Sequence, residues 1–166
     1  MPDAFLFPIA LAAALGCGLM AGTFFAFSAF VLKALAQLPA ERGIAAMQSI
    51  NVVVLNPLFL GVFVGTAALC LVLAVVAFMR WAHPAAAWLL AGSVLYLLGN
   101  LFVTRAFNIP LNNALARLDP STPGAASVSR AYVVDWGRWN HVRTITALLG
   151  AAAFTCGLCR VAAAPA

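Results

Sequence analysis

The stretch VVVLNPLFLGVFVGTAALCLVLAVVAFM, residues 52–79, carries no charged side chain and decides the class of fold. About 20 apolar residues in a helix are enough to cross the ~30 Å hydrocarbon core of a bilayer. Two other uncharged runs, residues 4–32 and 81–104, are also long enough. Of all residues 65% are hydrophobic and 8% are charged, whereas soluble domains carry about 25% charged residues. The sequence therefore predicts an integral membrane protein.

A fourth uncharged run, residues 144–159, is shorter than the other three. In a helix it would extend about 24 Å, a little less than the hydrocarbon core. Either Arg143 or Arg160 must then snorkel to the headgroups, or Arg143 must lie inside the mouth of the bundle.

We expect one all-α domain over residues 1–166, an integral membrane four-helix bundle of up-down-up-down topology. The short turn Trp81-Ala82-His83-Pro84 makes the second and third spans antiparallel, and Asn56-Pro57 predicts a kink in the second. A long, polar third loop or helix extension precedes the last span. The predicted spans lie near residues 5–35, 52–79, 85–105 and 140–160, the first being a retained helix rather than a signal peptide.

Positive charge gathers near the first and third loops, while the other side of the predicted bundle has only Arg80 and Arg160. The positive-inside rule then places both loops in the cytoplasm, which for a bacterial protein means the inner membrane. The basic residues near these loops are Lys33, Arg42, Arg105, Arg117, Arg130, Arg138 and Arg143.

Several kinds of chemistry are excluded by what the sequence lacks. None of the acidic residues lies in a predicted span, which excludes a carboxylate-bridged di-iron bundle and a proton relay of carboxylates. His83 and His141 are predicted on opposite membrane faces, so a two-histidine haem or metal site is not expected. The four cysteines in apolar spans are interpreted as small buried residues. We therefore predict no metal, no cofactor and no nucleic-acid partner.

One narrow helical stripe combines Tyr132, Trp136, Trp139 and Arg143, which fall within about 60° of one another at 100° per residue. Two indoles, a phenol and a guanidinium on one face suit a flat aromatic ligand that bears oxygens. The alternative is the belt of aromatic residues found at any membrane interface.

The end of the third span offers a second polar group. If its helix continues past Pro110, then Arg105, Asn108 and Asn112 project within one 60° sector, with Asn51 at the start of the second span nearby. Alternatively, Arg105 only interacts with the negative end of the helix dipole. His141 lies opposite Arg143 on the helical wheel, so it reaches the same cavity only if the third loop folds over that face or if the helix is irregular there.

Four blocks of sequence resemble the anthrone-oxygenase-like family of small membrane proteins, most of which are known only as a domain of unknown function. The blocks are Ala21-Gly22-Thr23-Phe24-Phe25-Ala26-Phe27-Ser28, Met47-Gln48-Ser49-Ile50-Asn51 with Asn56-Pro57, Phe107-Asn108-Ile109-Pro110-Leu111-Asn112-Asn113, and Trp136-x2-Trp139-Asn140-His141-Val142-Arg143-Thr144.

The resemblance implies a four-helix membrane fold and a reaction that oxidises an anthrone to an anthraquinone with dioxygen, without a metal or flavin. It implies His141 as the base and Arg143 and Arg105 as the groups that hold the oxyanion. Asn108, Asn112 and Asn140 would orient the substrate, Trp136 and Trp139 would stack on it, and Asn51 would line the same cavity. The expected partners are a small aromatic substrate, dioxygen and the lipid bilayer. The competing interpretation is a non-enzymatic membrane subunit or small-molecule binder whose polar cluster is structural.

Overall fold

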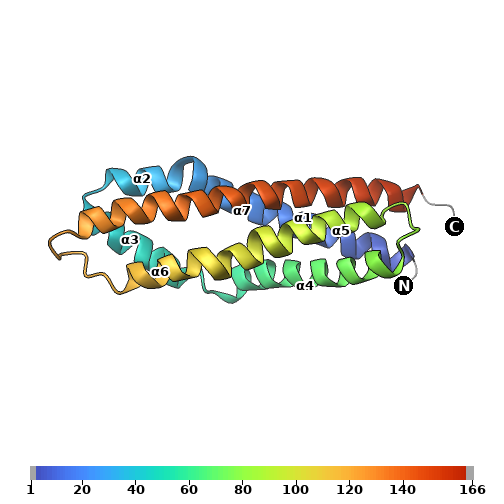
Figure 1. Cartoon of the computed structure of the whole chain (residues 1–166), viewed down its shortest axis with the longest axis horizontal. Coiled ribbons are helices and arrows are strands. Elements are labelled where there is room, and N and C mark those ends of the chain that lie inside the picture. The colour runs from blue at the N-terminus through green and yellow to red at the C-terminus, as the bar shows by residue number, and fades with distance from the viewer. Residues whose placement is uncertain (1–2, 164–166) are drawn as a thin grey trace.

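The structure is a computed structural model that describes residues 3–163, and every element in that range is a helix (Figure 1). Three of these elements are short π-helical turns, η1 to η3, which lie within the longer helices. In chain order the elements are α1 (Asp3–Ala26), η1 (Phe27–Val31), α2 (Leu32–Gln37), α3 (Ala40–Val53), α4 (Pro57–Met79), α5 (Ala86–Tyr96), η2 (Leu97–Phe102), η3 (Thr104–Asn108), α6 (Ile109–Ala116) and α7 (Ala125–Ala162).

Four helices are long and apolar enough to cross a membrane: Phe5–Gln37, Pro57–Met79, Ala86–Ala116 and Ala125–Ala162. Both ends of the described chain and the α4–α5 turn lie at one end of the bundle, and the α6–α7 loop lies at the other (Figure 1). The predicted all-α, four-helix membrane bundle with up-down-up-down topology is therefore confirmed.

The second span begins at Pro57 rather than near residue 52, because Asn56-Pro57 starts a new helix instead of kinking a continuous one. The Asn56 side chain accepts a hydrogen bond from the backbone N–H of Phe59 at 2.9 Å. Pro57 follows at the first helical position, where its missing N–H costs nothing. The preceding segment forms the separate helix α3.

The third span, here called the third helix (Ala86–Ala116), is longer than the predicted 85–105. Its helix passes through η2 and η3 and continues as α6. Pro110 does not stop it: this residue lies at the junction of the wide π-helical turn η3 and α6, and the helix continues past the missing N–H.

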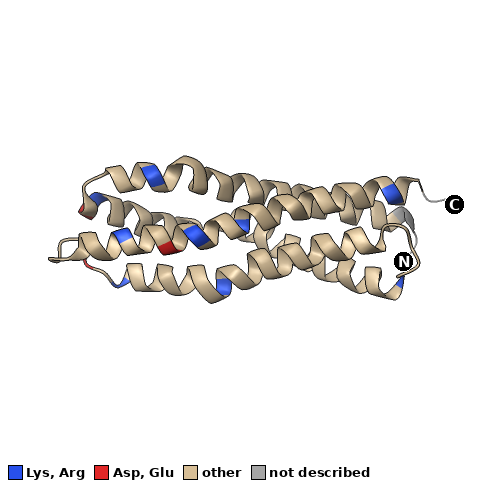
Figure 2. Cartoon of the chain, turned by 45° about the horizontal axis from the view of Figure 1, so that its top comes forward, with Lys and Arg blue, Asp and Glu red and all other residues tan. Residues whose placement is uncertain are grey.

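Helix α7 has 38 residues, which corresponds to about 57 Å and exceeds the thickness of the hydrocarbon core. Its first half therefore projects beyond the spans, where it packs with α2, α3 and α6; we call these four segments the cap. Most charged residues lie on this half of the molecule (Figure 2). The exposed Arg138 and Arg160 are about 33 Å apart along α7, close to the thickness that a bilayer requires.

Candidate functional site

Arg143 lies inside the bundle, at the level where the cap meets the spans. Its side chain is only 5% exposed. The guanidinium donates from Nη1 to the Thr104 hydroxyl at 3.2 Å and from Nη2 to the Asn140 side-chain oxygen at 2.8 Å. The short fourth apolar run allowed Arg143 either to snorkel to the headgroups or to lie inside the mouth of the bundle. In the structure it lies inside the bundle. The aromatic belt does not explain this residue.

No carboxylate compensates the charge of Arg143 among the described contacts. Its guanidinium carbon lies 4.2 Å from the ring centre of Phe24 and 4.9 Å from that of Trp136, so two ring faces stabilise the cation. Asp135 pairs instead with exposed Arg138 on the surface of α7. Asp119 lies in the α6–α7 loop, where hydrogen bonds from the Ser121 backbone and hydroxyl lower the pKa of its carboxyl.

Asn140 ties Arg143 to the first helix. It is fully buried, and its amide nitrogen donates to the Phe24 carbonyl and to the Ser28 hydroxyl, both at 2.7 Å. Its oxygen accepts from Arg143. All of these contacts are within the protein, and the bond from Arg143 fixes the guanidinium relative to Asn140.

Four buried polar atoms around Arg143 have no hydrogen-bond partner among the described residues. They are the Nε of Arg143, the indole Nε1 of Trp136, the Nδ2 of Asn51 and the Oδ1 of Asn108. Three are donors and one is an acceptor. Buried polar groups without partners are rare and cost about 1–3 kcal/mol each, so a group of them indicates a place for a polar ligand or ordered water. We call these four residues, with Thr104, Tyr132 and Asn140, the Arg143 cluster.

The third helix and α7 meet along a seam of paired residues that crosses the cluster. Asn108 Nδ2 donates to the Trp136 carbonyl at 3.4 Å, and the Tyr132 hydroxyl donates to Asn112 Oδ1 at 2.9 Å. Because the two helices are antiparallel, the contacts follow one another as successive rungs. From the spans toward the cap, the rungs are Asn100–Thr146, Thr104–Arg143, Phe107–Trp139, Asn108–Trp136 and Asn112–Tyr132.

All three π-helical turns lie beside this cluster. Turn η1 follows Phe24 and contains Ser28, and η2 and η3 contain Asn100 and Asn108. π-helical turns are rare, and they occur frequently at functional sites. Their coincidence with the buried polar residues supports the assignment of the cluster as the candidate site.

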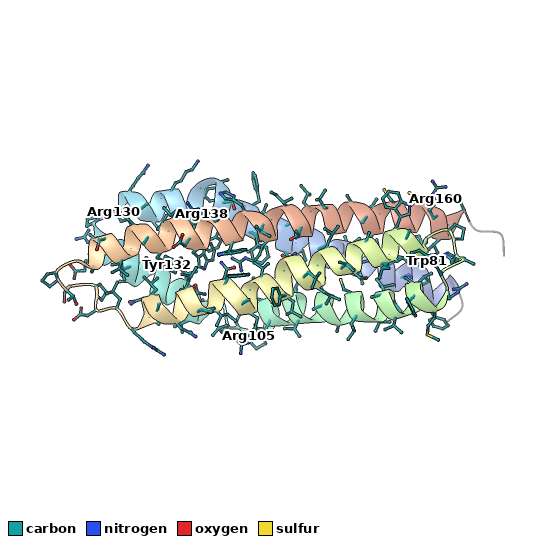
Figure 3. All side chains as sticks on the ribbon, viewed as in Figure 1. Trp81, Arg105, Arg130, Tyr132, Arg138 and Arg160 are labelled. Carbon is teal, nitrogen blue, oxygen red and sulfur yellow. The ribbon has the colours of Figure 1, made fainter. Side chains whose placement is uncertain are left out.

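Of the predicted stripe on α7, Tyr132, Trp136 and Arg143 are all buried. Trp139 is half-buried and stacks on Phe107 at the edge of the site. In Figure 3, Tyr132 points into the bundle, whereas Arg130 and Arg138 point away from it.

Of the predicted site residues outside the cluster, Asn112 and Trp139 lie at its edge, whereas Arg105 and His141 are exposed. Arg105 is exposed and points away from the bundle (Figure 3), so its predicted position in one sector with Asn108 is corrected. The reason is η3, whose wider turn breaks the 100° periodicity on which that prediction rested. His141 is exposed, on the opposite side of α7 from Arg143, because no segment within residues 3–163 covers that face.

The concave pocket expected from the sequence remains a prediction. A cavity of about 20 Å³ lies in the cap beside the cluster, which is room for about one water molecule. Its lining is mainly apolar and includes Leu32, Ile44, Met47, Leu115 and Tyr132.

Three contributors to the site were not identified from the sequence: Phe24, Ser28 and Thr104. Phe24 and Ser28 belong to the first block of the family resemblance, which was the available signal for them. Thr104 carried no signal, because a lone threonine at the end of an apolar span is ordinary.

Fold and site together define a four-helix membrane protein with a buried arginine that has no counter-ion among the described residues. A model of the anthrone oxygenase family matches residues 59–153, more than half of the chain. The chain therefore belongs to this family. Searches of curated proteins and of solved structures gave no match.

Proposed function

We propose that the protein is a membrane-bound, cofactor-independent oxygenase that oxidises an anthrone-like or other small polycyclic phenolic aromatic with dioxygen. The observation that carries this proposal is the buried Arg143, whose Nε, together with the indole N–H of Trp136, has no partner among the described residues. Family membership supports the same reaction class.

A buried guanidinium without a carboxylate favours an anion beside it. Removal of a charge from water is costly unless an opposite charge or strong hydrogen bonds compensate. The two aromatic faces compensate in part. An oxyanion that accepts from Arg143 Nε and Trp136 Nε1 would complete the compensation, in a site of low dielectric where such bonds are strong.

The reaction requires little else from the protein. Loss of one CH proton turns an anthrone into an anion whose charge is delocalised onto its oxygen. One electron passes from that anion to dioxygen, and the resulting radical and superoxide combine to form a C–O bond. The peroxide takes up a proton, and loss of water with the second CH hydrogen gives the quinone. One anthrone and one dioxygen thus yield one anthraquinone and one water.

In this proposal Arg143 and Trp136 hold the oxyanion, and Asn51 and Asn108 orient the substrate through their free amide atoms. Asn140 and Thr104 hold the guanidinium in position. The enol form of the substrate would lose its O–H proton to water. The positive charge of Arg143 would favour this ionisation because it stabilises the resulting oxyanion. His141 remains the sequence-predicted base, and the exposed position of its side chain makes that role the first to be tested.

Substitution of Arg143 by Lys in oxygen-uptake assays with anthrone, on membranes that contain the protein, tests the proposal. Lysine keeps the charge but loses the planar donor set, so we expect uptake to fall at least about 100-fold. Arg138→Lys, which changes an exposed arginine of the same helix, is the matched control and should keep full activity. Full activity in both variants would contradict the role of Arg143, and no anthrone-dependent uptake by the unmodified protein would favour the non-enzymatic alternative, in which the cluster is structural.

We also propose that the cap faces the cytoplasm, in a bacterial inner membrane. The support is the excess of Lys and Arg on the cap compared with the opposite end (Figure 2).

A further inference from the structure

One rung of the seam between the third helix and α7 has no hydrogen bond. Phe107 and Trp139 stack there with ring centres 3.6 Å apart and planes only 7° from parallel. Both side chains are half-buried. Phe102, which is 57% exposed, meets Phe107 edge-on at 6.3 Å. The stack therefore lies between an exposed aromatic side chain and the buried Arg143 cluster.

The two hydrogen bonds that flank this stack are long. They run from Asn108 to the Trp136 carbonyl and from Arg143 to Thr104 and measure 3.4 and 3.2 Å, more than the usual N–H···O length of about 2.9–3.0 Å. The bond from Tyr132 to Asn112, farther along the seam, measures 2.9 Å. Toward the first helix, the two bonds from Asn140 measure 2.7 Å and the Ser28–Thr144 contact 3.3 Å. The long bonds beside the stack favour this part of the seam as the place where a ligand enters.

The cap offers no comparable route. Its cavity of about 20 Å³ holds about one water molecule and is lined by side chains of α2, α3, α6 and α7. A tricyclic ring system would need this whole group of helices to move apart. An apolar ligand, moreover, is concentrated in the bilayer rather than in the water that surrounds the cap.

We propose that the indole face of Trp139 is a binding platform for planar aromatic ligands. Phe107 occupies this platform in the closed state, and ligands reach it laterally from the bilayer through this seam. This inference rests on the proposed function, since the ligand is the one whose oxygen reaches Arg143. Trp139 and Arg143 lie one helical turn apart on the same face of α7. A ring that replaces Phe107 on Trp139 therefore directs its edge toward the guanidinium.

Two cysteine pairs in lipid nanodiscs test the route, with the exposed Cys156 and Cys159 replaced by Ser. Asn100→Cys with Thr146→Cys places a disulfide across the seam, where the two side chains are 3.2 Å apart, and leaves Phe107 and Trp139 in place. Ser28→Cys with Thr144→Cys is the matched control on the other side of α7, where the two hydroxyls are 3.3 Å apart. The probe is 1,8-dihydroxyanthraquinone, a planar phenol that does not consume dioxygen, and binding is followed by its absorbance before and after oxidation of each pair.

We expect oxidation of the seam pair to slow probe binding at least 10-fold, with recovery on reduction, and oxidation of the control pair to change it less than 2-fold. Equal rates in the oxidised and reduced seam pair would overturn the lateral route. Slowing by the control pair alone would also overturn it, because access would then lie along the first helix. If unmodified protein fails to bind the probe, the proposed function itself is wrong; if it binds and only the seam result fails, the proposed function stands.

The platform has its own test in the single variant Trp139→Ala, with Trp88→Ala as the control that removes an exposed indole near the opposite end of the bundle. Loss of one stacking face should weaken equilibrium probe binding about 3- to 10-fold in the first variant and leave the second unchanged. Unchanged affinity in Trp139→Ala would contradict the platform.

Discussion

Arg143 and Asn140 lie one turn apart on α7, and the Arg143 Nη2 donates to the Asn140 side-chain oxygen at 2.8 Å. The amide nitrogen of the same asparagine is bound to the first helix through Phe24 and Ser28. The guanidinium is thus fixed by a neutral partner rather than by a carboxylate. This arrangement holds the cation in place and leaves its charge available to a ligand.

A carboxylate supplied at position 104 should therefore disable the site while leaving Arg143 intact. Thr104 accepts from Nη1 at 3.2 Å, so Thr104→Asp would give the guanidinium an internal counter-ion. We expect anthrone-dependent oxygen uptake to fall at least about 10-fold, since a charge-assisted bond is about twice as strong as a neutral one. Thr104→Val, which removes one hydrogen bond and adds no charge, should cost less than about 3-fold. The reverse order of the two variants would contradict an anion-binding role.

The role of His141 is decided by His141→Ala. The family resemblance predicts that this variant loses activity and regains part of it at high pH, where hydroxide replaces the missing base. The exposed position of the side chain leads us to expect uptake within about 2-fold of the unmodified protein. A pH-dependent loss of about 100-fold or more, the typical contribution of a general base, would restore His141 as the base.

Close packing between α1 and α4 should make Gly16 and Gly18 respond differently to the same substitution. A Cβ on Gly16 would overlap the Thr66 side chain, whereas a Cβ on Gly18 would meet nothing within 4 Å. We expect Gly16→Ala to destabilise the protein by about 1–3 kcal/mol, measured by thermal unfolding in detergent. Gly18→Ala should be neutral or slightly stabilising, because alanine is the better helix former. Restoration of stability in the double variant Gly16→Ala with Thr66→Ala would attribute the effect to this contact.

The topology predicts opposite labelling of the two polar ends. Cysteines at the exposed positions 82 and 121, in a chain without Cys156 and Cys159, lie on the α4–α5 turn and on the α6–α7 loop. A membrane-impermeant maleimide added to one side should modify one of them and not the other. Modification of both from the same side would contradict a four-span arrangement.

The spans and the buried stripe on α7 were predictable because both depend on regular α-helical geometry. Uncharged runs of sufficient length define the spans, and a spacing of three or four residues places Tyr132, Trp136 and Arg143 on one face. The same wheel correctly puts His141 on the other face.

The third helix shows where that reasoning fails. Each π-helical turn contains about one residue more than an α-helical turn. The turns η2 and η3 therefore rotate the side chains that follow around the helix axis, and Arg105 and Asn108 lie on different faces. No local sequence pattern predicted these π-helical turns. The role of Asn140 was equally hidden, because its partners Phe24 and Ser28 are more than one hundred residues away in the chain.

The most direct test of an anion-binding Arg143 is the ionisation of a bound phenol. 1,8-Dihydroxyanthraquinone absorbs at longer wavelength once ionised, so its titration can be followed in protein-containing nanodiscs. An unpaired cation within about 4–6 Å should lower the ionisation midpoint of the bound probe by about 1–3 pH units relative to the same probe bound to Arg143→Gln. Equal midpoints in the two proteins would contradict the assignment of Arg143 as the group that holds an oxyanion.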